Sequence, residues 1–362
     1  MRILQVIPTL DTGGAQKLLE DLIPLIKRGN EIRVVVYQKT GSPIEKHIEE
    51  SGVPVYNLGI SKRSPKAIFR LRKFIKDTDI VQLHLFPNQY FAWIANLGLH
   101  KPLVFTEHST FNKRRNHKFL RKIEKRIYGK MNKVVCISDA VRKSLIHWLE
   151  IQPGDSKCEV IRNGINLHEF ISAIPQDPEK LFGRNGIPIL MISRFTDSKD
   201  HETVVRALPH IKNKDVFMVF VGDGENRKRI ENMATECGLK GSIIFLGQRE
   251  DVPILIKSAK LGIQSSHWEG FGLSALEMMA GGLPVLASDV KGLKDIIRDQ
   301  DLLFEKGNER DLANKINRIL DDKGYYEEKK IQCLYNSRDF DIKNTASKYL
   351  SLYEALSAIN LS

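Results

Sequence analysis

Residues 261–280 read LGIQSSHWEGFGLSALEMMA, and this stretch decides the fold. It begins with an apolar run, Leu261 to Gln264, which predicts a buried strand. A glycine-rich loop follows, and the run from Ala275 to Ala280 then favours a helix. A strand, a short loop and a helix in this order form the repeating unit of an open α/β sheet. In such a sheet ligands bind at the loops that follow the carboxyl ends of the strands.

The same order recurs on both sides of this stretch. Strand-like runs in the first half of the chain cover residues 2–7, 32–37, 53–57, 80–85, 103–106, 133–137 and 158–161. Those in the second half cover residues 187–193, 216–221, 242–246, 261–264, 284–287 and 302–304. Helix-like stretches lie between most of them, and the helix expected over residues 15–27 contains Pro24, which we expect to kink or shorten it. The alternation predicts two Rossmann-like, doubly wound parallel-sheet domains that face each other across a cleft.

The domain boundaries follow from a break in this alternation. Residues 167–185 contain Pro175, Pro178 and Gly183 among mixed polar residues, which predicts a linker. We therefore expect an N-terminal domain over residues 1–166 and a C-terminal domain over residues 186–341. A last helix-like stretch, about residues 342–362, lies beyond the second sheet.

Composition narrows the class of protein. The chain has 362 residues, of which 42% are hydrophobic and 28% charged, as expected of globular domains. Its four cysteines are scattered without a Cys-x-x-Cys pair, which argues against a disulfide framework or a metal cluster and fits a reducing cytoplasm. We find no leader pattern, and the most apolar run, residues 83–99, is interrupted by polar residues and Pro87, so we expect a cytoplasmic protein.

Positive charge is concentrated in residues 60–150. This window has twenty Lys and Arg against six Asp and Glu, a net charge of +14 in a chain whose total is +12. Between residues 113 and 130 the basic residues fall at helical spacing, with Phe119, Leu120, Ile123, Ile127 and Tyr128 between them. A solvated surface is one interpretation. A basic amphipathic helix also suits an anionic membrane surface, which we rank above nucleic acid because no recognised nucleic-acid module is present.

Glu269 and Glu277 flank the Gly-Phe-Gly turn, eight positions apart. Carboxylates accept hydrogen bonds from sugar hydroxyls, and backbone N–H groups at a helix N-terminus suit phosphates. The spacing by itself is also typical of a solvated helix face. Together with residues 278–285, however, the segment resembles the glutamate-seven-glutamate signature of retaining glycosyltransferases. It is most similar to family 4 of that group, which has the GT-B fold.

The resemblance implies separate tasks for the residues of this motif. Glu269 would contact hydroxyls of the transferred sugar, and Glu277 would bind the ribose hydroxyls. Backbone N–H groups would support the sugar and the diphosphate around Gly270, Phe271, Gly272 and Leu273. Trp268 would pack beside the sugar or serve as a core residue. Residues 247–249 resemble the segment that meets the nucleotide base through its backbone, which makes Gln248 a donor-binding candidate and leaves UDP and GDP open.

Two basic residues follow the first strand of the second domain, Arg194 and Lys199. Taken alone they form an ordinary basic loop. The resemblance implies that they hold the donor diphosphate, where Arg binds two phosphate oxygens and Lys acts as a point charge. Such cations can replace a metal ion, and we expect no metal or other cofactor. The two Asp-x-Asp triplets, residues 77–79 and 299–301, come before strands and so would lie at the edge of the sheet away from the ligand.

The first domain supplies further candidates. Gly13 and Gly14 precede a predicted helix, and taken alone they form a tight turn. The resemblance implies instead a loop that approaches the donor phosphate and the acceptor. His108 ends a strand and resembles the family's active-site histidine near the donor sugar. Some relatives have an acid after that histidine where this chain has Ser109, so the role of any acid stays open. Asn163, at the domain junction, is interpreted first as a structural residue and second as a donor-binding one.

These observations predict a retaining, metal-independent glycosyltransferase that moves a hexose-type sugar from a nucleotide-diphosphate sugar to an acceptor hydroxyl. By resemblance its last helix packs back on the first domain. The basic first domain suggests a lipid-linked or other glycan acceptor at the inner face of the cell membrane. The alternatives are a nucleotide-sugar epimerase of the same fold and a non-catalytic, membrane-associated sugar-nucleotide binder. A binder would have no evident use for the set Arg194, Lys199, Glu269 and Glu277.

Overall fold

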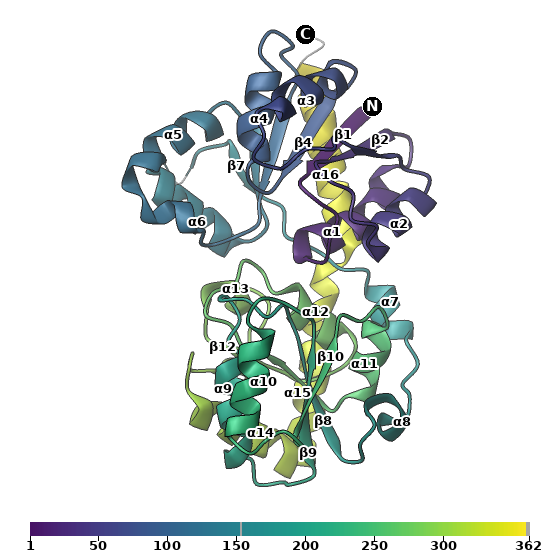
Figure 1. Ribbon diagram of the computed structural model, residues 1–362, viewed down its shortest axis with the longest axis vertical. Coiled ribbons are helices and arrows are strands. Elements are labelled where there is room, and N and C mark those ends of the chain that lie inside the picture. The colour runs from purple at the N-terminus through teal and green to yellow at the C-terminus, as the bar shows by residue number, and fades with distance from the viewer. Residues whose placement is uncertain (153, 360–362) are drawn as a thin grey trace. The chain divides into compact units, whose positions relative to one another are not determined.

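The computed structural model describes residues 1–152 and 154–359. The chain divides into two compact units, one formed by Met1–Gly164 with Ile342–Ser362 and the other by Ile165–Asp341. Each unit contains one parallel sheet with helices packed against it (Figure 1). Of the described residues, no helix combines the length and the apolar character that crossing a bilayer requires.

The first unit is built on a seven-stranded parallel sheet with the strand order β3-β2-β1-β4-β5-β6-β7. Its strands are β1 (Arg2–Ile7), β2 (Glu31–Val36), β3 (Val55–Asn57), β4 (Ile80–His84), β5 (Leu103–Glu107), β6 (Lys133–Cys136) and β7 (Cys158–Val160). Its helices are α1 (Gly14–Ile26), α2 (Pro43–Glu50), α3 (Lys66–Lys76), α4 (Asn88–Ala95), α5 (Lys118–Tyr128), α6 (Asp139–Leu149) and α16 (Ile342–Ile359), with a 3-10 turn η1 (Lys113–Asn116). Pro24 lies within α1 and does not shorten it, because the helix continues to Ile26.

The last helix belongs to the first unit. α16, yellow in Figure 1, packs against α1 and β4. Its buried residues recur every three or four positions, which places them on one face: Ala346, Tyr349, Leu352, Tyr353 and Leu356. This face joins Ile3, Ile7, Ile80 and Val104 in a single core cluster. The tyrosines carry hydroxyl groups into that core, and these hydroxyls need partners there.

The second unit is built on a six-stranded parallel sheet with the strand order β10-β9-β8-β11-β12-β13. Its strands are β8 (Ile187–Ile192), β9 (Val216–Val221), β10 (Ile243–Gly247), β11 (Leu261–Gln264), β12 (Val285–Ser288) and β13 (Leu303–Phe304). Its helices are α7 (Leu167–Ser172), α8 (Pro178–Phe182), α9 (His201–Ala207), α10 (Arg227–Glu236), α11 (Val252–Ser258), α12 (Leu273–Ala280), α13 (Lys291–Lys294), α14 (Glu309–Asp321) and α15 (Lys323–Ser337). Short 3-10 turns complete it: η2 (Leu208–His210), η3 (Gln300–Leu302) and η4 (Arg338–Phe340).

The prediction of a linker over residues 167–185 is wrong, because this segment contains α7 and α8. α7 packs on α11 and α12, and Phe170 and Phe182 are buried. Pro178 occupies the first turn of α8, where a proline costs nothing because its missing N–H would have no helical partner there. Gly183 ends the helix in the left-handed conformation, with φ of 69°. Pro178 and Gly183, two of the residues taken as linker signals, are therefore helix-boundary signals.

Gly164 lies where the chain leaves the first unit. A Cβ atom at this position would come within 2.8 Å of the backbone nitrogen and Cα of Ile342, at the start of α16. Thr345 also donates a hydrogen bond to the carbonyl of Arg162 at 2.9 Å. The Asn163-Gly164 pair thus has a structural task, since the glycine allows the returning chain to pack against the first unit.

Candidate active site

In each unit the strand order reverses beside the first strand. The second strand of each series lies on one side of the first, and the fourth lies on the other: β2 and β4 flank β1, and β9 and β11 flank β8. Loops after the two strands at such a point diverge to opposite faces of the sheet, which leaves a crevice where ligands of open α/β sheets bind. Lys199 follows β8 and Glu269 follows β11, so sequence segments 70 residues apart meet at this edge of the second sheet.

Backbone hydrogen bonds fasten these two loops together. Lys199 and Ser266 form an isolated antiparallel bridge. The amide of His267 donates to the carbonyl of Ser198 at 2.9 Å, and the amide of Asp200 donates to the carbonyl of Ser265 at 3.1 Å. The position of Lys199 relative to the β11 loop is therefore set by main-chain atoms.

The side chains of Lys199 and Glu269 form an ion pair. The Nζ atom of Lys199 donates to Oε2 of Glu269, and the two side chains are 16% and 17% exposed. The second carboxylate oxygen, Oε1, accepts the backbone N–H of Gly270 at 3.1 Å. A carboxylate can accept several hydrogen bonds, and sugar hydroxyls are suitable donors to it. The pair places one cation and one hydroxyl acceptor side by side.

The turn after Glu269 depends on two glycines. Gly272, directly before α12, lies in the left-handed region at φ of 101°, where a side chain would be strained and would also meet Leu293. A Cβ atom on Gly292 would lie 2.3 Å from the carbonyl oxygen of Glu269, so the backbone of α13 presses directly on the Glu269 loop. Gly292 was not among the predicted residues, and a lone glycine in the sequence gives little signal of such a contact.

Other predicted donor residues lie on the same unit with different exposures. Phe271 is buried, and its ring packs edge-on against Phe340 with centroids 5.6 Å apart, so its side chain belongs to the core. Glu277 lies in α12 and is 8% exposed, and Trp268 is half-buried. Arg194 and Gln248 are exposed in the loops after β8 and β10, and Leu273 is the first residue of α12.

The loop after β9 supports the Arg194 loop, which the sequence did not reveal. Gly222 and Gly224 have φ of 129° and 156°, and Cβ atoms there would lie 2.1 Å and 2.4 Å from the carbonyl oxygens of Ser193 and Phe195. The amide of Phe195 donates to the carbonyl of Asp223 at 3.0 Å. Two glycines therefore let the backbone on either side of Arg194 pack against a neighbouring loop.

A buried histidine, His201, begins α9 two residues after Lys199. The His201 ring stacks on Phe195 at 4.0 Å, and its Nε2 lies 2.9 Å from the hydroxyl of Ser193. Burial, with smaller contributions from the charges of Lys199 and Arg229, lowers the pKa of His201 to about 3. Asp200 caps α9 by accepting the amide of Thr203 at 3.1 Å. These contacts hold the β8 loop on the helix that follows it.

In the first unit, His108 follows β5 and contacts a second histidine. Its Nε2 lies 3.2 Å from Nδ1 of His84, the last residue of β4, and Nε2 of His84 lies 3.0 Å from Oε1 of Gln5. Burial lowers the pKa of His108 to about 4 and keeps that of His84 well below its ordinary value, with the neighbouring His108 as the second cause. Both rings are therefore neutral at pH 7. Neither His84 nor Gln5 was predicted, although each is a buried polar residue in a mostly apolar strand.

Glu107, the residue before His108, is buried. Its Oε2 accepts the hydroxyl of Tyr128 at 2.6 Å and lies 3.6 Å from a guanidinium nitrogen of Arg115. Its other oxygen accepts the amide of Ser109 at 3.4 Å. These contacts give Glu107 a structural task in holding α5 and η1.

The remaining first-unit candidates lie at the expected edge. Gly14 is the first residue of α1, and the carbonyl of Gly13 accepts the amide of Lys17 at 2.9 Å. The side chain of Gln16 fills the space where a Cβ atom on Gly13 would sit, at 2.6 Å. Asn163 is 2% exposed, and its side-chain oxygen has no hydrogen-bond partner among the described residues.

The two Asp-x-Asp triplets are engaged in ion pairs at the amino ends of strands. Asp79 pairs with Arg2 at 2.8 Å, and Asp299 pairs with Lys329 at 2.6 Å. Within residues 1–152 and 154–359, no group of three or more His, Cys, Asp and Glu side chains is arranged to hold a metal ion.

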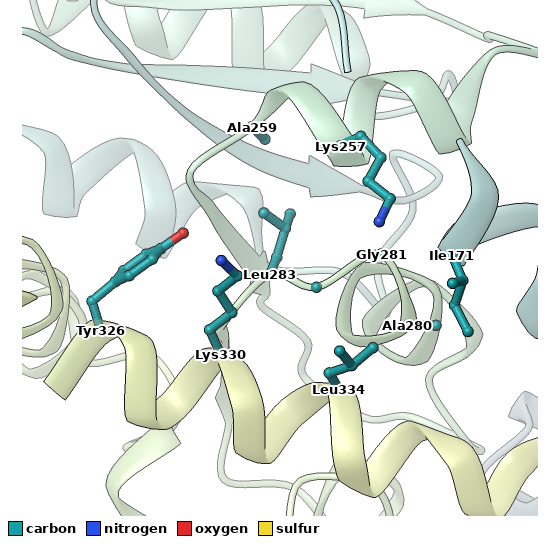
Figure 2. A pocket seen from close by; sticks show the side chains of 10 residues that line it. Ile171, Lys257, Ala259, Ala280, Gly281, Leu283, Tyr326, Lys330 and Leu334 are labelled. Atoms are coloured by element: carbon teal, nitrogen blue, oxygen red, sulfur yellow. The ribbon is translucent and has the colours of Figure 1, made fainter. Parts of the chain in front are cut away.

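One cavity lies at the other edge of the second sheet. It has a volume of about 300 Å³ and opens between α7, α11, α12 and α15, where Lys257, Lys330 and Tyr326 line it (Figure 2). Ala259, which precedes β11, and Leu283, which precedes β12, also line it. It is therefore at the amino ends of these strands, away from the Lys199–Glu269 pair.

Comparisons with known proteins agree with this architecture. The Glycosyltransferase Family 4 model matches residues 12–169, and the Glycosyl transferases group 1 model matches residues 175–339. The chain belongs to the family 4 glycosyltransferases and is an enzyme of the hexosyltransferase type, which confirms the resemblance read from the sequence.

Two curated relatives and one solved structure illustrate the match. The chain is 27% identical to UDP-Gal:alpha-D-GlcNAc-diphosphoundecaprenol alpha-1,3-galactosyltransferase of Escherichia coli, with 88% of this chain and 87% of the relative covered. It is 25% identical to GalNAc-alpha-(1->4)-GalNAc-alpha-(1->3)-diNAcBac-PP-undecaprenol alpha-1,4-N-acetyl-D-galactosaminyltransferase of Campylobacter jejuni, with 97% of this chain and 98% of the relative covered. HepE of Anabaena, solved in complex with UDP and glucose, shares the fold with a TM-score of 0.87 at 19% identity, and 98% of this chain and 100% of HepE are covered. The two-domain GT-B fold is thereby confirmed.

Proposed function

We propose that this enzyme transfers a hexose-type sugar from a nucleotide-diphosphate sugar to an acceptor hydroxyl with retention of the anomeric configuration and without a metal ion. The observation that carries the proposal is the Lys199–Glu269 pair at the switch point of the second sheet. A cation there suits a diphosphate, and a carboxylate beside it suits sugar hydroxyls. Solved complexes of HepE with UDP-glucose support a donor of this class, since that protein has the same fold.

The proposed reaction follows from these groups. The acceptor hydroxyl attacks the anomeric carbon from the face that the diphosphate leaves. The bond from that carbon to the phosphate oxygen breaks with its electron pair going to the diphosphate, and a diphosphate oxygen takes the hydroxyl proton. Negative charge grows on the leaving group, where Lys199, Arg194 and the N-terminus of α12 would stabilise it. Glu269 would hold the sugar, and Glu277 the ribose.

We also propose that the acceptor is a lipid-linked or other glycan precursor, reached at an anionic membrane surface. The named relatives of Escherichia coli and Campylobacter jejuni act on undecaprenol-linked substrates. On α5 the side chains of Phe119 and Ile123 are 70% and 48% exposed, with exposed Lys122 and Arg126 beside them. Exposed apolar groups among cations are the pattern of an interfacial helix.

The test is turnover. The enzyme is incubated with UDP- and GDP-hexoses, first without and then with a polyprenyl-diphosphate-linked acceptor, in buffers with and without EDTA. Acceptor-dependent release of nucleoside diphosphate, an EDTA-insensitive rate and a product with the donor's anomeric configuration are expected. Epimerisation of the donor without acceptor would identify an epimerase, and donor binding without turnover would identify a binding protein. An inverted product or a rate lost in EDTA would overturn the mechanism.

A further inference from the structure

A row of polar side chains crosses the α16-covered face of the first sheet. Along β1, β4 and β5 every second side chain lies on the face of the sheet that α16 covers. Four of these side chains are polar and fully buried: Gln5, Gln82, His84 and Thr106. Two hydroxyls of α16, those of Tyr349 and Tyr353, reach the same row. A buried polar group without a partner is costly, so donors and acceptors in such a row must match along its whole length.

The direction of the hydrogen bonds is set at Gln82. Its Nε2 lies 3.4 Å from the carbonyl oxygen of Leu83 and 2.9 Å from the hydroxyl of Thr106. A backbone carbonyl can only accept, and the reversed amide would set two acceptors against each other, so the nitrogen faces Leu83. Oε1 of Gln82 then faces the hydroxyl of Tyr353 at 3.0 Å and must accept its proton.

The remaining bonds follow from that one. Because Tyr353 donates to Gln82, its oxygen is the acceptor for Nε2 of Gln5 at 3.5 Å. Oε1 of Gln5 then faces Nε2 of His84 at 3.0 Å, and this nitrogen must carry the proton of the neutral ring. Nδ1 of His84 is therefore an acceptor, and Nε2 of His108 donates to it across 3.2 Å.

We propose that Tyr353 of the last helix, oriented by Gln82 and acting through Gln5 and His84, holds His108 in its Nε2–H tautomer, so that Nδ1 of His108 is the ring's hydrogen-bond acceptor for a hydroxyl of the bound substrate. The identity of that ligand rests on the proposed function, and the tautomer does not. Tyr353, Gln82, Gln5 and His84 are positioning residues, because they act on the ligand only through His108. The final 18-residue helix thus fixes which atom of His108 is available for chemistry.

The tautomer can be measured directly in the substrate-free enzyme. Full-length protein labelled with ¹⁵N-histidine is studied by long-range ¹H–¹⁵N correlation at pH 7, and the signals of His108 and His84 are assigned by their loss in His108→Gln and His84→Gln. A protonated Nε2 and an unprotonated Nδ1 are expected in both rings. A protonated Nδ1 on His108, or an equal mixture of tautomers, overturns the proposal.

A pair of tyrosine variants tests the role of α16. Tyr353→Phe removes the hydroxyl that orients Gln5, and we expect the His108 signals to shift to a mixture of tautomers. Tyr349→Phe is the matched control, because it removes a buried hydroxyl of the same helix whose hydrogen-bond partner among the described residues is Thr106, at 3.0 Å. If Tyr353→Phe does not fold, Gln5→Leu removes the acceptor of His84 and should have the same effect. Unchanged tautomers in the folded variant would overturn the assignment.

Kinetics then separate this inference from the proposed function. In Tyr353→Phe, kcat/KM should fall roughly tenfold, the effect expected of a residue that orients a ligand-binding histidine, while Tyr349→Phe stays within about twofold. If the tautomer is as expected but the wild type transfers no sugar, the proposed function fails and the hydrogen-bonded row stands. If transfer is normal but His108 has the other tautomer, only the inference fails.

Discussion

The two sheets place opposite kinds of chemistry at corresponding edges. At the switch point of the first sheet, His84 and His108 are neutral and joined by hydrogen bonds to Gln5. At that of the second sheet, Lys199 and Glu269 form an ion pair that solvent partly reaches. The difference shows that two similar folds are specialised by the residues at their loops. A neutral, directional site suits hydroxyl recognition, and a charged one suits a diphosphate.

The charged site should be the more sensitive to substitution. Lys199→Ala should lower kcat/KM by about 100- to 1,000-fold, because it removes a cation placed where charge develops on the leaving group. Glu269→Gln leaves the positive charge of Lys199 without its partner and should lower kcat/KM by a similar factor. Because the side chains touch, the double substitution should cost much less than the product of the two.

Steady-state kinetics measure this effect, with Lys212→Ala as the control. Lys212 is 74% exposed and pairs with Asp321, so its removal should change little. Wild-type turnover in both Lys199→Ala and Glu269→Gln would remove the basis for a charged donor site.

Neutral buried histidines should make the fold sensitive to acid. Burial, with smaller contributions from the charges of Lys199 and Arg229, lowers the pKa of His201 to about 3. Burial also keeps the pKa of His84 well below its ordinary value, with the neighbouring His108 as the second cause. The unfolded chain binds these protons near pH 6.5, and the folded chain does not. Their contribution is therefore complete above pH 6.5 and is lost as the pH falls from there towards the folded values. The free energy of unfolding should drop by about 1.4 kcal/mol per pH unit for each histidine.

Urea denaturation at several pH values between 7.5 and 4.5 measures this slope. In His201→Gln the free energy of unfolding should fall less steeply with falling pH, by about 1.4 kcal/mol per pH unit, since glutamine does not titrate. An unchanged slope in this variant would mean that His201 is not held neutral in the folded state.

Gly292→Ala should damage the charged site through its backbone. The new methyl group would lie 2.3 Å from the carbonyl oxygen of Glu269, so the loop must move, at a cost of about 1–3 kcal/mol in unfolding free energy. Turnover should fall with it. Gly241→Ala is the control, because no atom lies within 4 Å of its Cβ position. Thermal unfolding with activity assays checks the pair, and equal stability of the two variants would contradict the close approach.

The smallest effect is expected at the surface of α5. Phe119→Ser with Ile123→Ser should weaken flotation with anionic liposomes several-fold and leave turnover of a soluble acceptor unchanged, because the apolar groups would contact only the membrane. Ile331→Ser with Tyr335→Ser removes comparable exposed apolar surface from α15 of the other unit and should have no effect on flotation. Binding that is equal in both double variants, or insensitive to salt, would remove the proposed membrane role.

Much of the architecture could be predicted from the sequence because strand and helix periods are local. The alternation of apolar runs gave two parallel sheets, and the glutamate motif pointed to the loop after Gln264. The linker prediction failed because Pro178 and Gly183 have the same composition signal at a helix boundary as in a loop. The supporting glycines Gly222 and Gly292 were missed because their task depends on backbone atoms from other loops.

The sequence by itself determined the family, the two sheets and the chemical character of the loops, since these follow from short-range patterns and from residue types. Only the tertiary structure decided that Lys199 meets Glu269, because strand order brings β8 beside β11. It also decided that His108 contacts His84, and that Tyr353 reaches Gln82 from 271 residues away. The direction of those hydrogen bonds depends on matching every buried donor with an acceptor, which is a property of the packed core and not of any one segment.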